Sequence, residues 1–133
     1  MSNLYNAKKT LMDGIWFASK AEAYFYLLLK QEKEEGKILD IELQPKYTLQ
    51  EGYYHKGVKI IAITYKADFK VTYADGSVVV IDVKGKKTEA FMIKAKLFMN
   101  LYPDIDFRLY KRLRSGRFEE IPLYKKRKGG NKK

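Results

Sequence analysis

Residues 77–85 read Ser-Val-Val-Val-Ile-Asp-Val-Lys-Gly, a run of β-branched residues that ends in a carboxylate and a lysine. β-Branched residues are enriched in strands, and an unbroken run of them is typical of a strand covered on both faces. The run therefore predicts a central strand over 77–83. Burying Asp82 in such a strand is expensive unless a cation, a lysine or a metal compensates for it. Side chains two residues apart share a face, so Asp82 and Lys84 are expected to point the same way.

The turn that precedes this strand decides where a second carboxylate, Asp68, lies. A two-residue turn at 75–76 would place Asp68 and Asp82 on opposite faces of the sheet. A three-residue turn at 74–76 puts a glycine where a type I turn with a bulge favours a left-handed residue, and it sets Asp68 directly across from Asp82. We favour the three-residue turn. Two opposed carboxylates destabilise a sheet, and a divalent cation between them removes the repulsion.

The rest of the pattern predicts one mixed α/β domain over residues 1–124. Ser19 and Glu22 have the spacing of a capping box, which predicts a helix over about 20–35 that Gly36 ends. Thr88 is expected to cap a second helix that runs to Leu101. Predicted strands are 38–51 (an edge strand containing Pro45), 58–64, 67–73, 105–110 and 118–124, with a hairpin at 9–17 and a loop at 51–57. The order α-β-β-β-α-β predicts a mixed sheet flanked by helices.

Helical spacing also predicts which side chains face the core. In the first helix these are Ala21, Tyr24, Phe25, Leu28 and Leu29, and in the second Phe91, Leu97, Phe98 and Leu101. Trp16 and most tyrosines are expected in the core or on a dimer surface.

Composition excludes several classes of protein. The 133 residues include no cysteine and one histidine, so disulfide scaffolds, cysteine zinc sites and multi-histidine metal sites are excluded. The formal net charge is +11, which predicts a polyanionic partner. Residues 125–133 contain six of the basic side chains and are predicted to form a disordered basic tail. No apolar run approaches the roughly 18 residues of a membrane span, and the N-terminus lacks the apolar segment of a signal peptide, so we expect a soluble, cytoplasmic protein with no membrane partner.

Glu22, at the start of the first predicted helix, would supply a third carboxylate. Carboxylate oxygens are the ligands that Mg²⁺ and Mn²⁺ prefer. Such an ion binds a phosphodiester oxygen and lowers the pKa of a bound water for attack. Lys84 could orient that water or stabilise charge in the transition state.

These residues resemble the pattern of the PD-(D/E)xK nuclease superfamily, in which a helix acid and a strand Asp precede D/E-x-K on the next strand. The chain is most similar to phage endonuclease I type Holliday junction resolvases and to a family of small uncharacterised phage proteins. The resemblance covers about residues 5–110. The matching features are Phe17-x-Ser-Lys-x-Glu22, Gln44-Pro45, Tyr65-x-x-Asp68-Phe69 and Asp82-Val-Lys-Gly85. The chain departs from the superfamily pattern at Ala67, where proline is usual, and from endonuclease I at Asp82, where that family has glutamate.

The resemblance implies a restriction-endonuclease-like core and a homodimer whose paired sites cut two strands. It also implies a Mg²⁺- or Mn²⁺-dependent endonuclease that hydrolyses phosphodiester bonds in branched or junction DNA, in the cytoplasm of a bacterial host infected by a phage. The implied catalytic residues are Glu22, Asp68, Asp82 and Lys84, and the metal ligands are the three acids with Val83. The resemblance also makes Gln44, which could otherwise be a plain edge residue, a candidate for positioning substrate or water. We predict further substrate contacts from five lysines, Lys20, Lys86, Lys87, Lys94 and Lys96.

Simpler interpretations stand beside these. Glu22 could serve only the capping box, Asp82 and Lys84 could form an ordinary ion pair at a strand end, and the lysines could belong to a solvated helix face. His55 is best explained as a surface residue, although its aromatic and basic neighbours are suited to contact nucleic acid. Two alternative functions follow: a non-catalytic basic nucleic-acid-binding protein with a nuclease-like fold, and a dimeric structural or regulatory phage protein.

Overall fold

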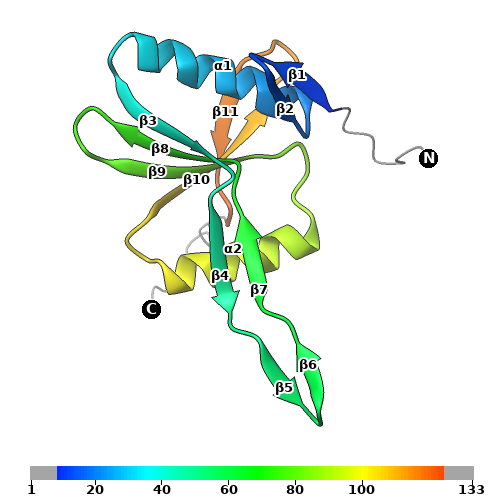
Figure 1. Cartoon of the computed structure of the whole chain (residues 1–133). Helices are drawn as coiled ribbons and strands as arrows, with labels where there is room; N and C mark the ends of the chain where they lie inside the picture. Colours follow the sequence, from blue (N-terminus) through cyan, green and yellow to red (C-terminus); the bar gives the residue numbers. More distant parts are fainter. Residues whose placement is uncertain (1–8, 125–133) are drawn as a thin grey trace, which may run out of the picture.

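A computed structural model describes residues 9–124 of the chain (Figure 1). Its centre is a five-stranded mixed sheet with the strand order β11-β10-β9-β8-β3. These strands are β3 (Ile38–Leu43), β8 (Phe69–Tyr73), β9 (Val78–Val83), β10 (Asp106–Arg112) and β11 (Phe118–Ile121). Helix α1 (Lys20–Glu34) covers one face and α2 (Glu89–Leu101) the other. The predicted α/β fold, a mixed sheet flanked by helices, is confirmed.

The only parallel pair in the described sheet is β9 with β10, because α2 connects these two strands as a crossover. The other pairs of the sheet are antiparallel. Within the described residues, no helix is both long and apolar enough to cross a membrane. The predicted basic tail lies outside the described residues.

The turn between β8 and β9 is the predicted three-residue turn. The backbone N–H of Tyr73 donates to the carbonyl of Ser77 at 2.9 Å, and Gly76 has a φ of +91°. Phe69 pairs with Ile81, so the next position outward brings Asp68 opposite Asp82. The predicted register is confirmed.

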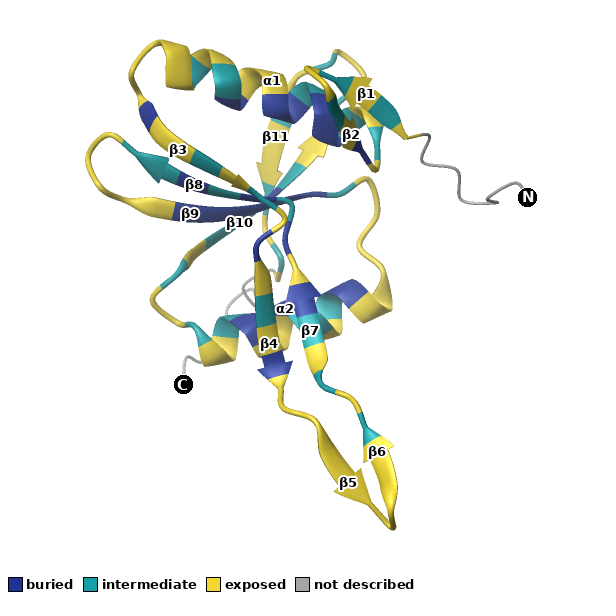
Figure 2. Ribbon diagram, in the orientation of Figure 1, coloured by how far each residue is buried: buried dark blue, intermediate teal, exposed yellow. Residues whose placement is uncertain are grey.

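The sheet separates two apolar layers. Val79, Ile81 and Val83 of β9 pack in the layer under α1, whereas Val80 packs in the layer under α2. Because side chains alternate between the faces of a strand, Asp82 points into the α2 layer. Figure 2 shows β9 buried along most of its length.

Helix α1 begins and ends as predicted, but its buried face differs. Ser19 caps it by accepting a hydrogen bond from the Glu22 N–H at 3.1 Å, and Gly36 follows with a φ of +83°. The buried residues are Glu22, Ala23, Phe25, Tyr26 and Leu29. The predicted inward residue Leu28 is 46% exposed, and Ala21 and Tyr24 are only half-buried. Residues 23–29 are apolar all round, so periodicity alone could not choose the face that the sheet covers.

Helix α2 shows the same kind of difference. Thr88 caps it as predicted, by accepting from the Phe91 N–H at 3.1 Å. Phe91, Ala95 and Phe98 are buried, but Leu97 and Leu101, predicted to face inward, are exposed. A small residue, Ala95, takes the central position because it lets the helix lie close to the sheet.

The predicted edge strand over 38–51 is only partly correct: β3 is an edge strand of the sheet, but the chain leaves the sheet at Gln44 and the second half forms a separate strand. β4 (Lys46–Gln50) pairs with β7 (Ile63–Lys66), and β5 (Tyr53–His55) pairs with β6 (Val58–Ile60). Together they form a two-stranded arm that projects from the sheet (Figure 1). Residues 51–57, predicted as a loop, therefore lie largely in a β-hairpin. Gly52 is required in the arm, because a Cβ there would lie 2.9 Å from the Ile60 carbonyl oxygen.

A second hairpin precedes α1, as predicted. β1 (Thr10–Met12) pairs with β2 (Ile15–Phe17), and both turn residues, Asp13 and Gly14, have positive φ. Such a turn suits the right-handed twist of a hairpin. At the other end of the domain, β11 ends at Ile121, short of the predicted residue 124.

Candidate functional site

Asp68 and Asp82 face each other where β8 and β9 end. Asp82 is fully buried: its Oδ2 accepts a hydrogen bond from the Tyr65 hydroxyl, whereas its Oδ1 has no hydrogen-bond donor. Asp68 Oδ2 accepts from the backbone N–H of Val83 at 2.8 Å. An acceptor that lacks a donor beside a second carboxylate is satisfied by a proton on one of the two groups or by a cation between them.

Lys84 is the nearest cation to this pair. Its Nζ lies 3.8 Å from Asp82 Oδ1, too far for a hydrogen bond, and 5.0 Å from the centre of the Phe91 ring in the α2 layer. Asp82 and Lys84 therefore share a face of β9, as the alternation predicts. The side chain of Lys84 is 34% exposed, so its ammonium group reaches solvent while Asp82 does not.

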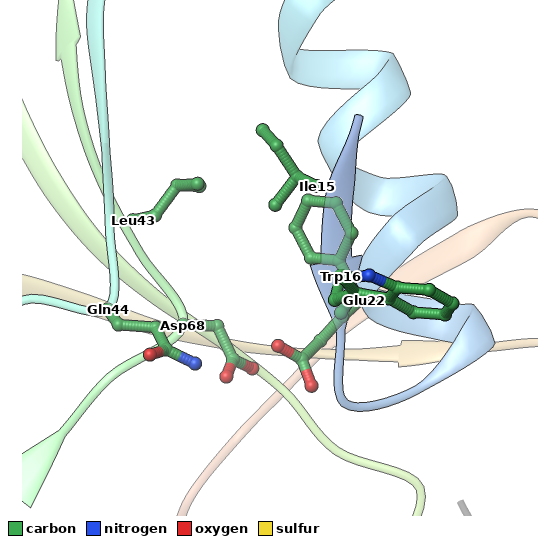
Figure 3. A pocket seen from close by; sticks show the side chains of 7 residues that line it. Ile15, Trp16, Glu22, Leu43, Gln44 and Asp68 are labelled. Atoms are coloured by element: carbon green, nitrogen blue, oxygen red, sulfur yellow. The ribbon is translucent and has the colours of Figure 1, made fainter. Parts of the chain in front are cut away.

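Glu22 approaches from the opposite face of the sheet. It lies on the buried side of α1 and is itself buried. Beyond the Leu43–Phe69 pair, β3 and β8 leave the sheet for the arm. At the point where these strands leave the sheet, the carboxylates of Glu22 and Asp68 turn toward each other (Figure 3), close enough for each to affect the pKa of the other. Asp68 is thus the acid that links the other two.

Burial and mutual repulsion raise the pKa of all three acids. Loss of solvent, followed by the charge of Asp68, raises the pKa of Asp82 to about 8. Loss of solvent is also the main cause that raises the pKa of Asp68 to about 6, with the carboxylate of Glu22 adding to it and the hydrogen bond from the Val83 N–H and the charge of Lys84 opposing it. Burial raises the pKa of Glu22 as well. The pair Asp68–Asp82 therefore holds one proton near neutral pH when no cation is bound.

The carboxylate oxygens of this site suit a hard divalent cation, although the structure does not hold three such side chains close enough together to bind one. Among residues 9–124, no group of three acidic, histidine or cysteine side chains lies close enough to hold a metal as it stands. Mg²⁺ is usually held by only one or two carboxylates, with water and substrate phosphate completing its shell. Asp68 and Asp82, with the orphan Oδ1, fit that requirement. Direct ligation by Glu22, or by the main chain of Val83, stays a prediction.

A cavity of about 130 Å³ opens beside the acids. Glu22, Asp68 and Gln44 line it on the polar side, and the apolar wall consists of Ile15, Trp16, Phe17 and Leu43 (Figure 3). Gln44 has a φ of +52°, and its N–H donates to the Asp68 carbonyl at 3.0 Å. The structure thus brings one predicted substrate contact, Gln44, to the acids.

The predicted lysine contacts are placed less directly. Lys20 is exposed at the first position of α1, and Lys86 is exposed in the segment between β9 and α2. Lys87 donates to the Pro122 carbonyl at 3.1 Å, and the Lys96 ammonium lies 5.6 Å from the centre of the Tyr124 ring. Lys94, on α2, is half-buried. Lys87 and Lys96 therefore contact the segment after β11, and phosphate binding by these five lysines stays a prediction.

Two residues of the site were not assigned from the sequence. Trp16, predicted in the core or on a dimer surface, is 65% exposed and lines the cavity. Tyr65 is buried under α2 and is the hydrogen-bond donor to Asp82. The only signal for Tyr65 was its place three residues before Asp68, because the arm that carries it was not predicted.

Comparison with known proteins bears on the family but not on the activity. A family model matches residues 2–120, which is most of the chain. The chain belongs to the family DUF1064. That family is described only as a protein of unknown function. Comparisons with curated proteins and with solved structures gave no significant match. Membership of DUF1064 therefore leaves the nuclease resemblance as a prediction.

Proposed function

We propose that this protein is a Mg²⁺- or Mn²⁺-dependent endonuclease that hydrolyses phosphodiester bonds in branched DNA. The observation that carries the proposal is the pair formed by the fully buried Asp82 and the half-buried Asp68 opposite it. Two carboxylates placed opposite each other in a sheet, one with an oxygen that lacks a donor, are unfavourable for folding alone. Such groups cluster at functional sites, and a cation that is held there converts the repulsion into binding.

Each residue has a role that its position supports. Asp68 and Asp82 would hold the cation, with Glu22 completing the shell directly or through water. The metal supplies a Lewis acid for the phosphate and an acidified water. The hydroxyl of Tyr65 fixes the orientation of Asp82. Lys84, charged and partly exposed beside Asp82, is positioned to orient the attacking water or to stabilise charge on the phosphate.

The charge of the chain supports a nucleic-acid substrate. The net charge of +11 favours a polyanion, and long-range attraction of this kind is strongly weakened by salt. The choice of branched DNA, a homodimer with two sites and action in the cytoplasm of a phage-infected bacterium rest on the resemblance to junction resolvases.

A second function also has an observation in its favour. Without metal, Asp68 and Asp82 share a proton and Lys84 lies near Asp82. These two features reduce the repulsion between the carboxylates, so the protein can fold without a bound metal ion. A basic protein that binds nucleic acid without cutting it would need nothing more. Such a protein binds DNA in chelator, with no stabilisation by Mn²⁺.

The deciding experiment is a cleavage panel of junction, flap and linear DNA in Mg²⁺, Mn²⁺ or chelator. We expect the wild-type protein to cut branched DNA with either metal. The Asp82→Asn variant should lose at least about 100-fold in rate, the scale of one electrostatic contact in a transition state. Asp106→Asn is the matched control, an exposed acid paired with Arg108, and should cut normally. Equal cutting by Asp82→Asn and wild type, or none by the wild type, would refute the proposal.

A further inference from the structure

The cavity beside the acids has a wall that phosphate chemistry does not require. Its aromatic side is Trp16, which leaves most of its ring in solvent although it stands on a hairpin packed against α1. Exposing a large apolar ring costs hydrophobic free energy, and tryptophan is enriched at binding interfaces, where one part of its ring is apolar and its N–H can bond. The β1–β2 hairpin holds the ring at the mouth of the cavity (Figure 3).

Other residues that line the same cavity are polar, and two of them are acidic. Glu22 and Asp68 would repel a phosphate that is not bridged by a cation, but they tolerate a neutral ring. The amide of Gln44 offers both a donor and an acceptor, which is the combination that reads a base edge. Its backbone is held at a positive φ that few residues other than glycine adopt, so the side chain is presented to the cavity by a constrained main chain.

The size of the cavity agrees with a single ring. An apolar cavity of about 150 Å³ takes up benzene, and this one measures about 130 Å³ and is lined in part by the exposed Trp16. A base inside a duplex cannot reach such a recess, because both of its faces are stacked. An unpaired base at a branch or flap can enter it, next to the proposed metal ligand Asp68, which lines the cavity.

We propose that this cavity is a nucleobase-binding site, in which one unpaired base stacks on Trp16 and is contacted at its edge by Gln44. The inference rests on the proposed function for its ligand, DNA, and it supplies a physical reason for a preference for branched substrates. Stacking of a base on an aromatic side chain is worth enough to change the dissociation constant by about 5- to 150-fold.

Trp16 is the only tryptophan of the chain, so its fluorescence reports on the cavity directly. The probes are a blunt hairpin duplex, the same duplex with a short single-stranded flap, and that flap with abasic nucleotides, all titrated in chelator to prevent cleavage. The abasic flap keeps every phosphate and removes only the bases. We expect the normal flap to quench the fluorescence, and the blunt duplex and the abasic flap to leave it nearly unchanged.

Affinity for labelled DNA gives the second readout. Trp16→Ala should weaken binding of the flap by about 5- to 150-fold and leave binding of the blunt duplex within about twofold, while Trp16→Phe should keep part of the preference. Leu11→Ala is the matched control: Leu11 is exposed, pairs with Trp16 across the hairpin and does not line the cavity. The Leu11→Ala variant should prefer the flap over the blunt duplex as strongly as the wild type does.

The results separate this inference from the proposed function. Equal quenching by all three probes, no quenching by any, or equal loss of flap preference in Leu11→Ala and Trp16→Ala would overturn the base site. Selective quenching by the flap in a protein that cuts no DNA in Mg²⁺ would keep the base site and refute the endonuclease.

Discussion

Replacing Asp82 by asparagine should stabilise the metal-free protein at pH 8. The amide keeps the shape of the side chain, can still accept from the Tyr65 hydroxyl and can donate to Asp68 in place of the shared proton. It removes a charge that is fully buried and opposed by a second carboxylate. An isosteric change at a buried acid would ordinarily be expected to destabilise, which makes the sign of the effect informative.

The size follows from the pKa of Asp82, about 8 in the folded protein and about 3.9 in an unfolded chain. The folded state keeps this proton up to about pH 8, whereas the unfolded state releases it near pH 4. Folding therefore takes up a proton between these values, and stability falls as pH rises through that window. Linkage puts the loss at about 1.5 kcal/mol by pH 5 and about 5 kcal/mol by pH 8. Relaxation of the site lowers both figures, so we expect a measured gain for Asp82→Asn of at least about 1 kcal/mol at pH 8 and a smaller one at pH 5.

The assay is urea denaturation in chelator at pH 5, 6.5 and 8, followed by the same titrations in excess Mg²⁺ or Mn²⁺. A bound cation at 100 times its dissociation constant stabilises a protein by about 2.7 kcal/mol, and the wild type should show this whereas Asp82→Asn should not. The control Asp106→Asn changes a surface ion pair with Arg108 and should stay within about 1 kcal/mol of the wild type at every pH.

The opposite sign would refute the reasoning. If Asp82 and Lys84 were simply a buried structural ion pair, removing one partner would cost about 3–5 kcal/mol. A loss of that size at pH 8, with no effect of metal on the wild type, would leave a basic fold with no cation site.

Three further predictions concern Lys84, Tyr65 and the lysines at the tip of the arm. Lys84→Met should keep the stabilisation by Mg²⁺, measured by thermal melting, but should lower the cleavage rate by about 100-fold, and a normal rate would exclude Lys84 from the chemistry. Tyr65→Phe should cost about 1–3 kcal/mol in urea denaturation, more at pH 9 than at pH 5, because its hydroxyl then donates to an ionised Asp82; a cost that does not vary with pH would contradict this. Replacing Lys56, in the arm's hairpin turn, and Lys59, on β6 next to that turn, by alanine should reduce the slope of log affinity against log salt by about 2 if each contacts one phosphate, and an unchanged slope would place the arm away from DNA.

Several features of the fold follow from local chemistry and were predicted correctly. The caps of both helices, the hairpin before α1 and the register between β8 and β9 each depend on a few neighbouring residues whose conformations are restricted. The register mattered most, because one glycine, Gly76, decides whether Asp68 and Asp82 share a face. The conformational preferences of this turn are therefore enough to predict that two of the three acids, Asp68 and Asp82, lie opposite each other.

What the sequence could not determine depends on packing between distant segments. Residues 23–29 of α1 are apolar on every side, and only contact with the sheet selects the face that carries Glu22 inward. The arm was not predicted because the pairing of strands that are distant in sequence leaves only a weak local pattern. The hydrogen bond from Tyr65 to Asp82 therefore could not be predicted either. The sequence around Trp16 does not show whether its ring is buried or exposed, because that depends on how the β1–β2 hairpin packs against the rest of the domain. Local conformation is encoded over a few residues, whereas burial and proximity are properties of the assembled layers, and those layers decide that an acid, an amide and an exposed indole meet at one cavity.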